Sequence, residues 1–221
     1  LKRLILFDNL TSEYFGKTYI KNKKEFNITY KFFIDKTCDL LNNLGININT
    51  VPVLDLKYKG SSNIIGDRSF SKNPKIVSEI GNLCIDYCKD NSIGTVIKHI
   101  PGHGLAKSDS HHFTPIVNKS YNYLKRNDFK VFKSKNSLFA MTAHIIFKKI
   151  DPNNTVTHSK KLISIIRNQI KFKNLIITDD ISMKSLKYSI VENTVRAFNA
   201  GCNLVLHCNG NIKEMTDVAM N

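Results

Sequence analysis

Short apolar runs alternate with longer amphipathic segments along most of the 221-residue chain. Five short runs are β-branched or aliphatic and are flanked by Gly, Asn or Asp, a pattern typical of buried strands. They cover residues 46–54, 95–99, 138–145, 175–178 and 204–206. The other segments carry apolar residues at helical spacing, which predicts helices over residues 32–44, 74–88, 160–170, 191–200 and 212–220.

Strands and helices that alternate in this way predict a parallel sheet with helices outside, in either a doubly wound sheet or a (β/α) barrel. Polar residues lie at or just after the C-terminal end of each of the five apolar runs. They are Asp55, Lys98 with His99, His144, Asp179 with Asp180, and His207 with Asn209. A barrel brings all such strand ends to one mouth, whereas a doubly wound sheet binds ligands only near its switch point. Five polar strand ends therefore favour the barrel.

Five strands are too few for a complete barrel, which has eight strands and about 250 residues. Residues 1–27 contain one short apolar run, at 4–7, followed by polar sequence with scattered aromatic residues. No Pro-rich or low-complexity linker divides the chain. We therefore expect residues 1–221 to be a single α/β domain, a (β/α)8 TIM-type barrel that is incomplete at its N-terminus, with the first strands upstream.

Composition narrows the choice of partner. Hydrophobic residues make up 42% and charged residues 23% of the chain, as in a globular protein. The net charge of +15 suggests a phosphate-rich partner. The lysines, however, occur singly or in pairs along the whole sequence, so we interpret them as a solvated surface and expect no nucleic-acid partner. No apolar stretch approaches the roughly 20 residues that cross a membrane, so no membrane partner is expected either.

Cysteine and histidine usage does not predict a metal or cofactor. The five cysteines lack the spacing of a disulfide framework or zinc ribbon, which fits a reducing compartment. Cys84 and Cys88, four apart in a helical pattern, are expected to be core thiols. Five histidines between His99 and His144 raise the question of a metal site. No His-Glu-x-x-His or Cys-x-x-Cys motif supplies a ligand set, and we expect none.

The most informative segment is residues 98–112. It leaves a strand with Lys98 and His99, turns through Pro101, Gly102, His103 and Gly104, and then places Asp109 two residues before His111. The two glycines allow backbone geometry or a close approach that a side chain would prevent. Such a loop can hold polar groups over a cleft. The alternative is that its histidines only form hydrogen bonds within the loop.

A second segment, residues 176–183, ends a strand with the adjacent carboxylates Asp179 and Asp180. Their side chains point in opposite directions if the strand continues through them, so that one can face the barrel mouth while the other binds neighbouring loops. The alternative is that Asp180 or Ser182 caps a following helix. This segment alone supports the two interpretations about equally.

Together, these segments resemble glycoside hydrolase family 3, and within it the bacterial β-N-acetylhexosaminidases of the NagZ type. The resemblance follows the expected order over nearly the whole chain. Residues 49–55 are similar to a strand ending in Pro-Val-Leu-Asp, residues 65–74 to the loop of a substrate-binding arginine, and residues 98–111 to the acid/base loop. Residues 141–144 resemble Met-Pro-Ala-His with Thr142 in place of Pro, residues 178–183 the nucleophile segment, and residues 200–206 the strand that follows.

The resemblance implies the catalytic roles. Asp179 would be the nucleophile that forms a glycosyl-enzyme ester. His111 would protonate the leaving oxygen and later deprotonate water, and Asp109 would orient its imidazole. Most glycosidases use two carboxylates instead. An unperturbed pKa near 6.5 nevertheless suits a histidine that acts first as an acid and then as a base.

The resemblance also implies the substrate. Arg68, Lys98 and His99 would bind sugar hydroxyls, whereas His103 would pack the loop. The expected activity is that of a retaining exo-β-N-acetylglucosaminidase, which removes terminal β-linked N-acetylglucosamine from 1,6-anhydro-muropeptides in the bacterial cytoplasm without cofactor or metal.

One family segment is missing. Nothing matches the family's Asp-Gln-Glu-Gly-Gly, and Leu1 stands where sequence just beyond it is expected. We therefore expect either a fragment of a longer protein or a barrel that has lost part of itself. A catalytically silent sugar-binding or scaffold remnant is one alternative function. A phosphorylase is another, because a histidine acid/base would not repel incoming phosphate.

Overall fold

The structure is a computed structural model that describes residues 9–60, 65–107 and 113–220. Five strands form one sheet in which every neighbouring pair is parallel. They are β1 (Ile48–Asn49), β2 (Gly94–Ile100), β4 (Phe139–Thr142), β6 (Leu175–Asp180) and β7 (Leu204–Leu206). A separate two-stranded ribbon pairs β3 (Ile116–Val117) with β5 (Ile146–Phe147). The five predicted strands are thus confirmed, although the first is shorter than residues 46–54.

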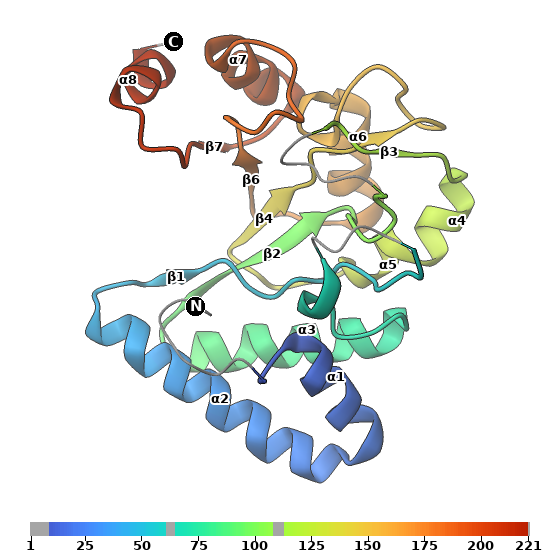
Figure 1. The fold of residues 1–221 in the computed structure, drawn as a ribbon, viewed down its shortest axis with the longest axis vertical. Coiled ribbons are helices and arrows are strands. Elements are labelled where there is room, and N and C mark those ends of the chain that lie inside the picture. The colour runs from blue at the N-terminus through green and yellow to red at the C-terminus, as the bar shows by residue number, and fades with distance from the viewer. Residues whose placement is uncertain (1–8, 61–64, 108–112, 221) are drawn as a thin grey trace.

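The order of the strands identifies the type of sheet. Along the sheet the order is β1-β2-β4-β6-β7, so each new strand is added at the same edge (Figure 1). A doubly wound sheet reverses direction at its switch point, whereas a barrel adds its strands in sequence. The fold is therefore an α/β arrangement of the barrel type that is incomplete, as predicted. The apolar run at residues 4–7 lies outside the described residues.

Helices connect the strands. α3 (Pro74–Asp90) leads into β2, and α7 (Ile190–Ala200) joins β6 to β7. The other connections and ends are α1 (Ser12–Lys21), α2 (Lys23–Asn43), α4 (Tyr121–Arg126), α5 (Asp128–Val131), α6 (Lys160–Ile165) with the π turn η3 (Ile166–Ile170), and α8 (Ile212–Met220), together with the 3₁₀ turns η1 (Gly66–Arg68) and η2 (Val156–His158). Figure 1 shows α1, α2 and α3 together at one end of the molecule, and α7 and α8 at the other.

The N-terminal region differs from the prediction. The expected helix at residues 32–44 begins at Lys23, and α1 precedes it in a stretch that showed no helical pattern in the sequence. Asn22 separates the two helices, and its side chain accepts hydrogen bonds from the N–H groups of Lys24 and Glu25. The scattered aromatic residues pack where the helices meet, with ring centroids of Phe15 and Tyr30 4.8 Å apart. Both helices pack against each other and against α3.

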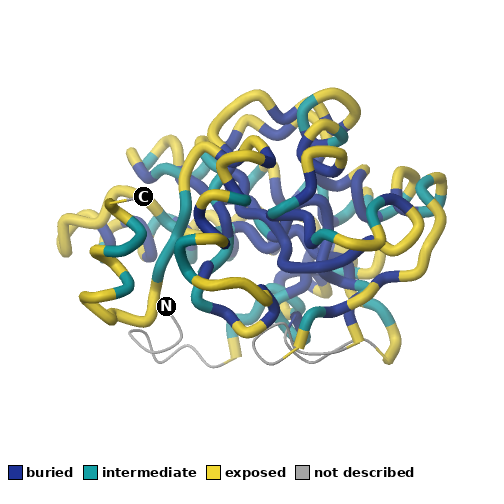
Figure 2. The backbone as a smooth tube through the Cα atoms, turned by 90° about the horizontal axis from the view of Figure 1, so that it is seen from above, coloured by how far each residue is buried: buried dark blue, intermediate teal, exposed yellow. Residues whose placement is uncertain are grey.

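The core lies between the sheet and these helices. Figure 2 shows buried backbone through the centre of the molecule and exposed backbone at its periphery. Ile97, Ala140 and Ile176, on three neighbouring strands, are fully buried. Cys84 and Cys88 are buried free thiols, which confirms their predicted place in the core. Within the described ranges, no helix is both long and apolar enough to cross a membrane.

Candidate active site

Asp55 lies at the centre of the polar groups that follow the strands. It comes after the extended segment that begins with β1, and its side chain is fully buried. Its carboxylate accepts hydrogen bonds from the backbone N–H of His99 at 3.2 and 3.3 Å, from Nδ1 of His99 at 2.7 Å and from the N–H of His103 at 2.6 Å. Burial alone would raise the pKa of Asp55, but the imidazole of His99 and these bonds hold the pKa below its usual value. Asp55 is therefore ionised although its side chain is fully buried.

His99 connects this carboxylate to Asp179. The ring is buried, and its Nδ1 faces Asp55. Its Nε2 lies 3.8 Å from Oδ2 of Asp179, at the end of β6. Because parallel strands end at the same edge of a sheet, residues 44 and 80 positions apart along the chain come together here. The structure thus aligns Asp55, His99 and Asp179 in one row.

Asp179 is the carboxylate of this row that solvent can reach, since 23% of its side chain is exposed. Burial raises its pKa, whereas the imidazoles of His99 and His144, the N–H of Asp180 and the ammonium of Lys98 lower it. The net effect is a pKa below the ordinary value. Asp179 is thus an ionised and accessible carboxylate at neutral pH, as a nucleophile requires.

Asp180 points the other way and binds the neighbouring turns. Its carboxylate accepts from the N–H of Ser182 at 3.0 Å, from the hydroxyl of Ser182 at 2.8 Å and from the N–H of Cys208 at 3.2 Å. These bonds join the turn after β6 to the segment after β7. The opposite orientation of the two carboxylates is confirmed. Asp180 also caps the turn that follows β6, since it accepts the N–H of Ser182, but it does not cap a helix, because α7 begins at Ile190 and is capped by Ser189.

His144, which follows β4, fixes the same backbone from another side. Its Nε2 lies 3.0 Å from the carbonyl oxygen of Asp180, and its Nδ1 lies 2.7 Å from the hydroxyl of Thr157. Burial lowers the pKa of this histidine, so the neutral ring donates from Nε2 and accepts at Nδ1. The sequence placed His144 at a strand end but gave it no role. Nothing in the spacing revealed its partner Thr157.

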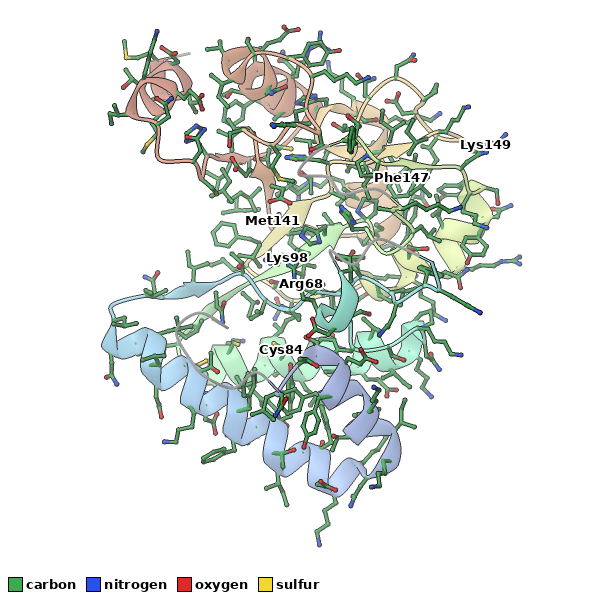
Figure 3. The ribbon with its side chains drawn as sticks, viewed as in Figure 1. Arg68, Cys84, Lys98, Met141, Phe147 and Lys149 are labelled. Carbon is green, nitrogen blue, oxygen red and sulfur yellow. The ribbon has the colours of Figure 1, made fainter. Side chains whose placement is uncertain are left out.

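Two of the three expected sugar-binding residues line one cleft. Lys98, at the end of β2, and Arg68, in η1, lie close together in Figure 3. They border a cleft of about 400 Å³ that α1 and α2 also line. Burial and the neighbouring guanidinium of Arg68 lower the pKa of Lys98 to about 8, and its ammonium donates to the hydroxyl of Thr50 at 3.1 Å. His99, the third, instead lies between Asp55 and Asp179.

The turn at residues 101–104 is held by close contacts of its glycines. A Cβ on Gly104 would lie 2.1 Å from the carbonyl oxygen of Leu56, and Gly102 has a φ of +139° beside the side chain of Asp128. The ring of His103 is buried, and its burial lowers its pKa to about 4. This agrees with its predicted packing role. Asp109 and His111 lie outside the described residues.

The described part of the chain contains no group of three or more His, Cys, Asp or Glu side chains placed to hold a metal ion. The polar groups at the sheet edge instead form the row of Asp55, His99 and Asp179. The site as described is therefore one accessible carboxylate, a buried histidine bound to a second carboxylate, and two cations beside a cleft.

Comparison with known proteins assigns the chain to a family. The model of the glycosyl hydrolase family 3 N-terminal domain matches residues 35–221, and the chain belongs to this family. A curated beta-hexosaminidase of Nitrosomonas eutropha is 35% identical over 170 residues, covering 75% of this chain and 49% of that protein. One of Actinobacillus pleuropneumoniae is 36% identical over 172 residues, with the same two shares. The chain thus spans about half the length of these curated relatives.

Solved structures agree. Native NagZ from Neisseria gonorrhoeae superposes with a TM-score of 0.84 at 27% identity, over 93% of this chain and 61% of that one. A family 3 beta-N-acetylglucosaminidase from Paenibacillus superposes with a TM-score of 0.80 at 26% identity, over 84% of this chain and 37% of that one. The family and the barrel-type fold expected from the sequence are thereby confirmed.

Proposed function

We propose that this chain is the catalytic barrel of a retaining exo-β-N-acetylglucosaminidase and forms a single domain. The observation that carries the proposal is Asp179, an accessible carboxylate at the C-terminal edge of the sheet whose pKa is lowered by His99 and His144 despite burial. The similar proteins named beta-hexosaminidase and beta-N-acetylglucosaminidase support the substrate class. So does the solved complex of gonococcal NagZ with N-trifluoroacetyl-D-glucosamine, which is 26% identical to this chain.

In the proposed reaction Asp179 attacks the anomeric carbon. The bond from that carbon to the leaving oxygen breaks, and the oxygen takes a proton from the imidazolium of His111, which Asp109 orients. Water then attacks the same carbon and gives a proton to His111, while the ester bond to Asp179 breaks. Both steps invert the anomeric centre, so the product retains the β configuration.

Binding residues complete the proposal. We assign Lys98, Arg68 and His99 to the sugar hydroxyls. Lys98 and Arg68 line the 400 Å³ cleft, and His99 lies 3.8 Å from Asp179. The finer substrate we propose is a 1,6-anhydro-muropeptide with terminal β-linked N-acetylglucosamine, in the bacterial cytoplasm. The four buried free thiols Cys38, Cys84, Cys88 and Cys202 agree with a reducing compartment.

The test is release of 4-nitrophenol from its N-acetyl-β-D-glucosaminide. We expect turnover by the chain and a loss of roughly 10⁴-fold or more in kcat for Asp179→Ala, because the covalent step is removed. Asp151→Ala is a matched control, since this partly buried carboxylate binds Asn154 and Ser159 away from the sheet edge. Unchanged activity of Asp179→Ala would show that Asp179 is not the nucleophile.

Two further outcomes would replace the proposal. Sugar binding without turnover would indicate the silent remnant. Formation of N-acetylglucosamine 1-phosphate when phosphate is added would indicate a phosphorylase. His111→Ala should reduce the cleavage rate of glycosides with poor leaving groups by a larger factor than that of glycosides with good ones, and equal losses would argue against general acid catalysis.

A further inference from the structure

Among the described residues, the groups that donate hydrogen bonds to the carboxylate of Asp55 are all N–H groups. They are the backbone N–H groups of His99 and His103 and the ring Nδ1 of His99, all within 3.3 Å. An ionised carboxylate can accept hydrogen bonds but cannot donate them. Nδ1 of His99 must therefore carry a proton, and Nε2, on the other side of the ring, lies 3.8 Å from Asp179.

We propose that Asp55 is a positioning residue for the nucleophile, because it holds His99 as the Nδ1–H tautomer with Nε2 directed toward Asp179 and the sugar. This inference rests on the proposed function. It adds a residue that touches neither the sugar nor the reacting atoms but acts through His99. Full burial of Asp55 keeps water from replacing it as the partner of Nδ1.

The same carboxylate also holds the turn at residues 101–104. Its Oδ1 lies 2.6 Å from the N–H of His103, whereas its Oδ2 receives Nδ1 of His99 at 2.7 Å. One side chain thus fixes both the ring beside Asp179 and the stem of the loop that follows β2. If Asp55 only stabilised the turn, its contact with His103 would be sufficient. The experiment must therefore report on its contact with Nδ1 of His99.

Asp55→Asn separates these two contacts. The amide keeps an oxygen that can accept from the N–H of His103, and this orientation turns the NH₂ toward Nδ1 of His99. A donor at that place excludes the Nδ1–H tautomer. The variant is therefore expected to retain the turn while His99 changes to the Nε2–H tautomer.

The primary test is nitrogen-15 NMR of the histidine rings at pH 8, with His99→Gln used to assign the signals. In the unchanged chain we expect a protonated Nδ1 on His99. In Asp55→Asn we expect that proton on Nε2. Asp128→Asn is the matched control, because Asp128 is another buried carboxyl that contacts the same turn, at Gly102, and bonds Tyr58 rather than a histidine. It should leave the tautomer of His99 as it is.

An unprotonated Nδ1 in the unchanged chain would overturn the inference even if Asp55→Asn failed to fold. An unchanged tautomer in a folded Asp55→Asn would overturn it as well. Neither measurement requires catalysis, so the result is independent of whether the chain hydrolyses any glycoside.

Discussion

His103 should make the stability of this fold depend on pH. Its ring is 3% exposed, and burial is the main reason that its pKa falls to about 4, compared with about 6.5 in an unfolded chain. Because the folded pKa is the lower one, the unfolded chain binds more protons between these values. The contribution of His103 is therefore fully present above pH 6.5 and is lost as the pH falls toward 4. The loss is about 2 kcal/mol at pH 5 and about 3 kcal/mol below pH 4.

The assay is urea unfolding at pH 7.5 and pH 5, followed by circular dichroism. The unchanged chain should lose about 2 kcal/mol more unfolding free energy between these pH values than His103→Gln, which has no imidazole to protonate. Leu105→Ala, in the same loop and packed against the core, is the control, because it weakens packing without removing a titrating group. Its difference from the unchanged chain should be the same at both pH values. Equal losses for the unchanged chain and His103→Gln would refute the reasoning.

Four further substitutions test other parts of the site. Burial raises the pKa of Asp128 to about 7, so Asp128→Asn should gain unfolding free energy relative to the unchanged chain as the pH rises from 4 to 8, on the order of 4 kcal/mol, in urea unfolding. Gly104→Ala should lower stability and activity together, because its Cβ would lie 2.1 Å from a carbonyl oxygen, and near-normal values of both would contradict this. The KM of the unchanged chain should rise above pH 8, where Lys98 loses its charge, and that rise should be absent from Lys98→Met. Asp180→Ala should lose about 2 to 4 kcal/mol in urea unfolding, since the N–H groups of two segments lose a charged acceptor.

The sequence predicts the middle of the sheet well because β2 and β4 are largely buried. Buried parallel strands are continuously apolar, and the polar residue that ends each run marks the C-terminal edge of the sheet. The same reasoning does not find α1 or the first part of α2, before residue 32. Their buried side chains are mostly aromatic and are divided between the two sides of Asn22, so neither segment alone shows a clear apolar stripe.

The site is predictable only in part. Family resemblance and position at a strand end single out Asp179, Lys98, His99 and Arg68 from the sequence. Asp55 was recognised as a strand end but not as the partner of His99, because that contact joins residues 44 positions apart. The bond between His144 and Thr157 is likewise invisible to motif spacing. Asp109 and His111 remain predictions.

Asp179 and Asp180 show how one strand end can supply two unlike carboxylates. The oxygens of Asp180 bind Ser182 and the N–H of Cys208, and its carbonyl lies 3.0 Å from Nε2 of His144. The backbone beside Asp179 is therefore held from β4, from the turn after β6 and from the segment after β7. Oδ2 of Asp179 lies 3.8 Å from Nε2 of His99, and 23% of the Asp179 side chain is exposed. The two acids are not interchangeable, because the fixed environment of Asp180 is what leaves Asp179 oriented and accessible for chemistry.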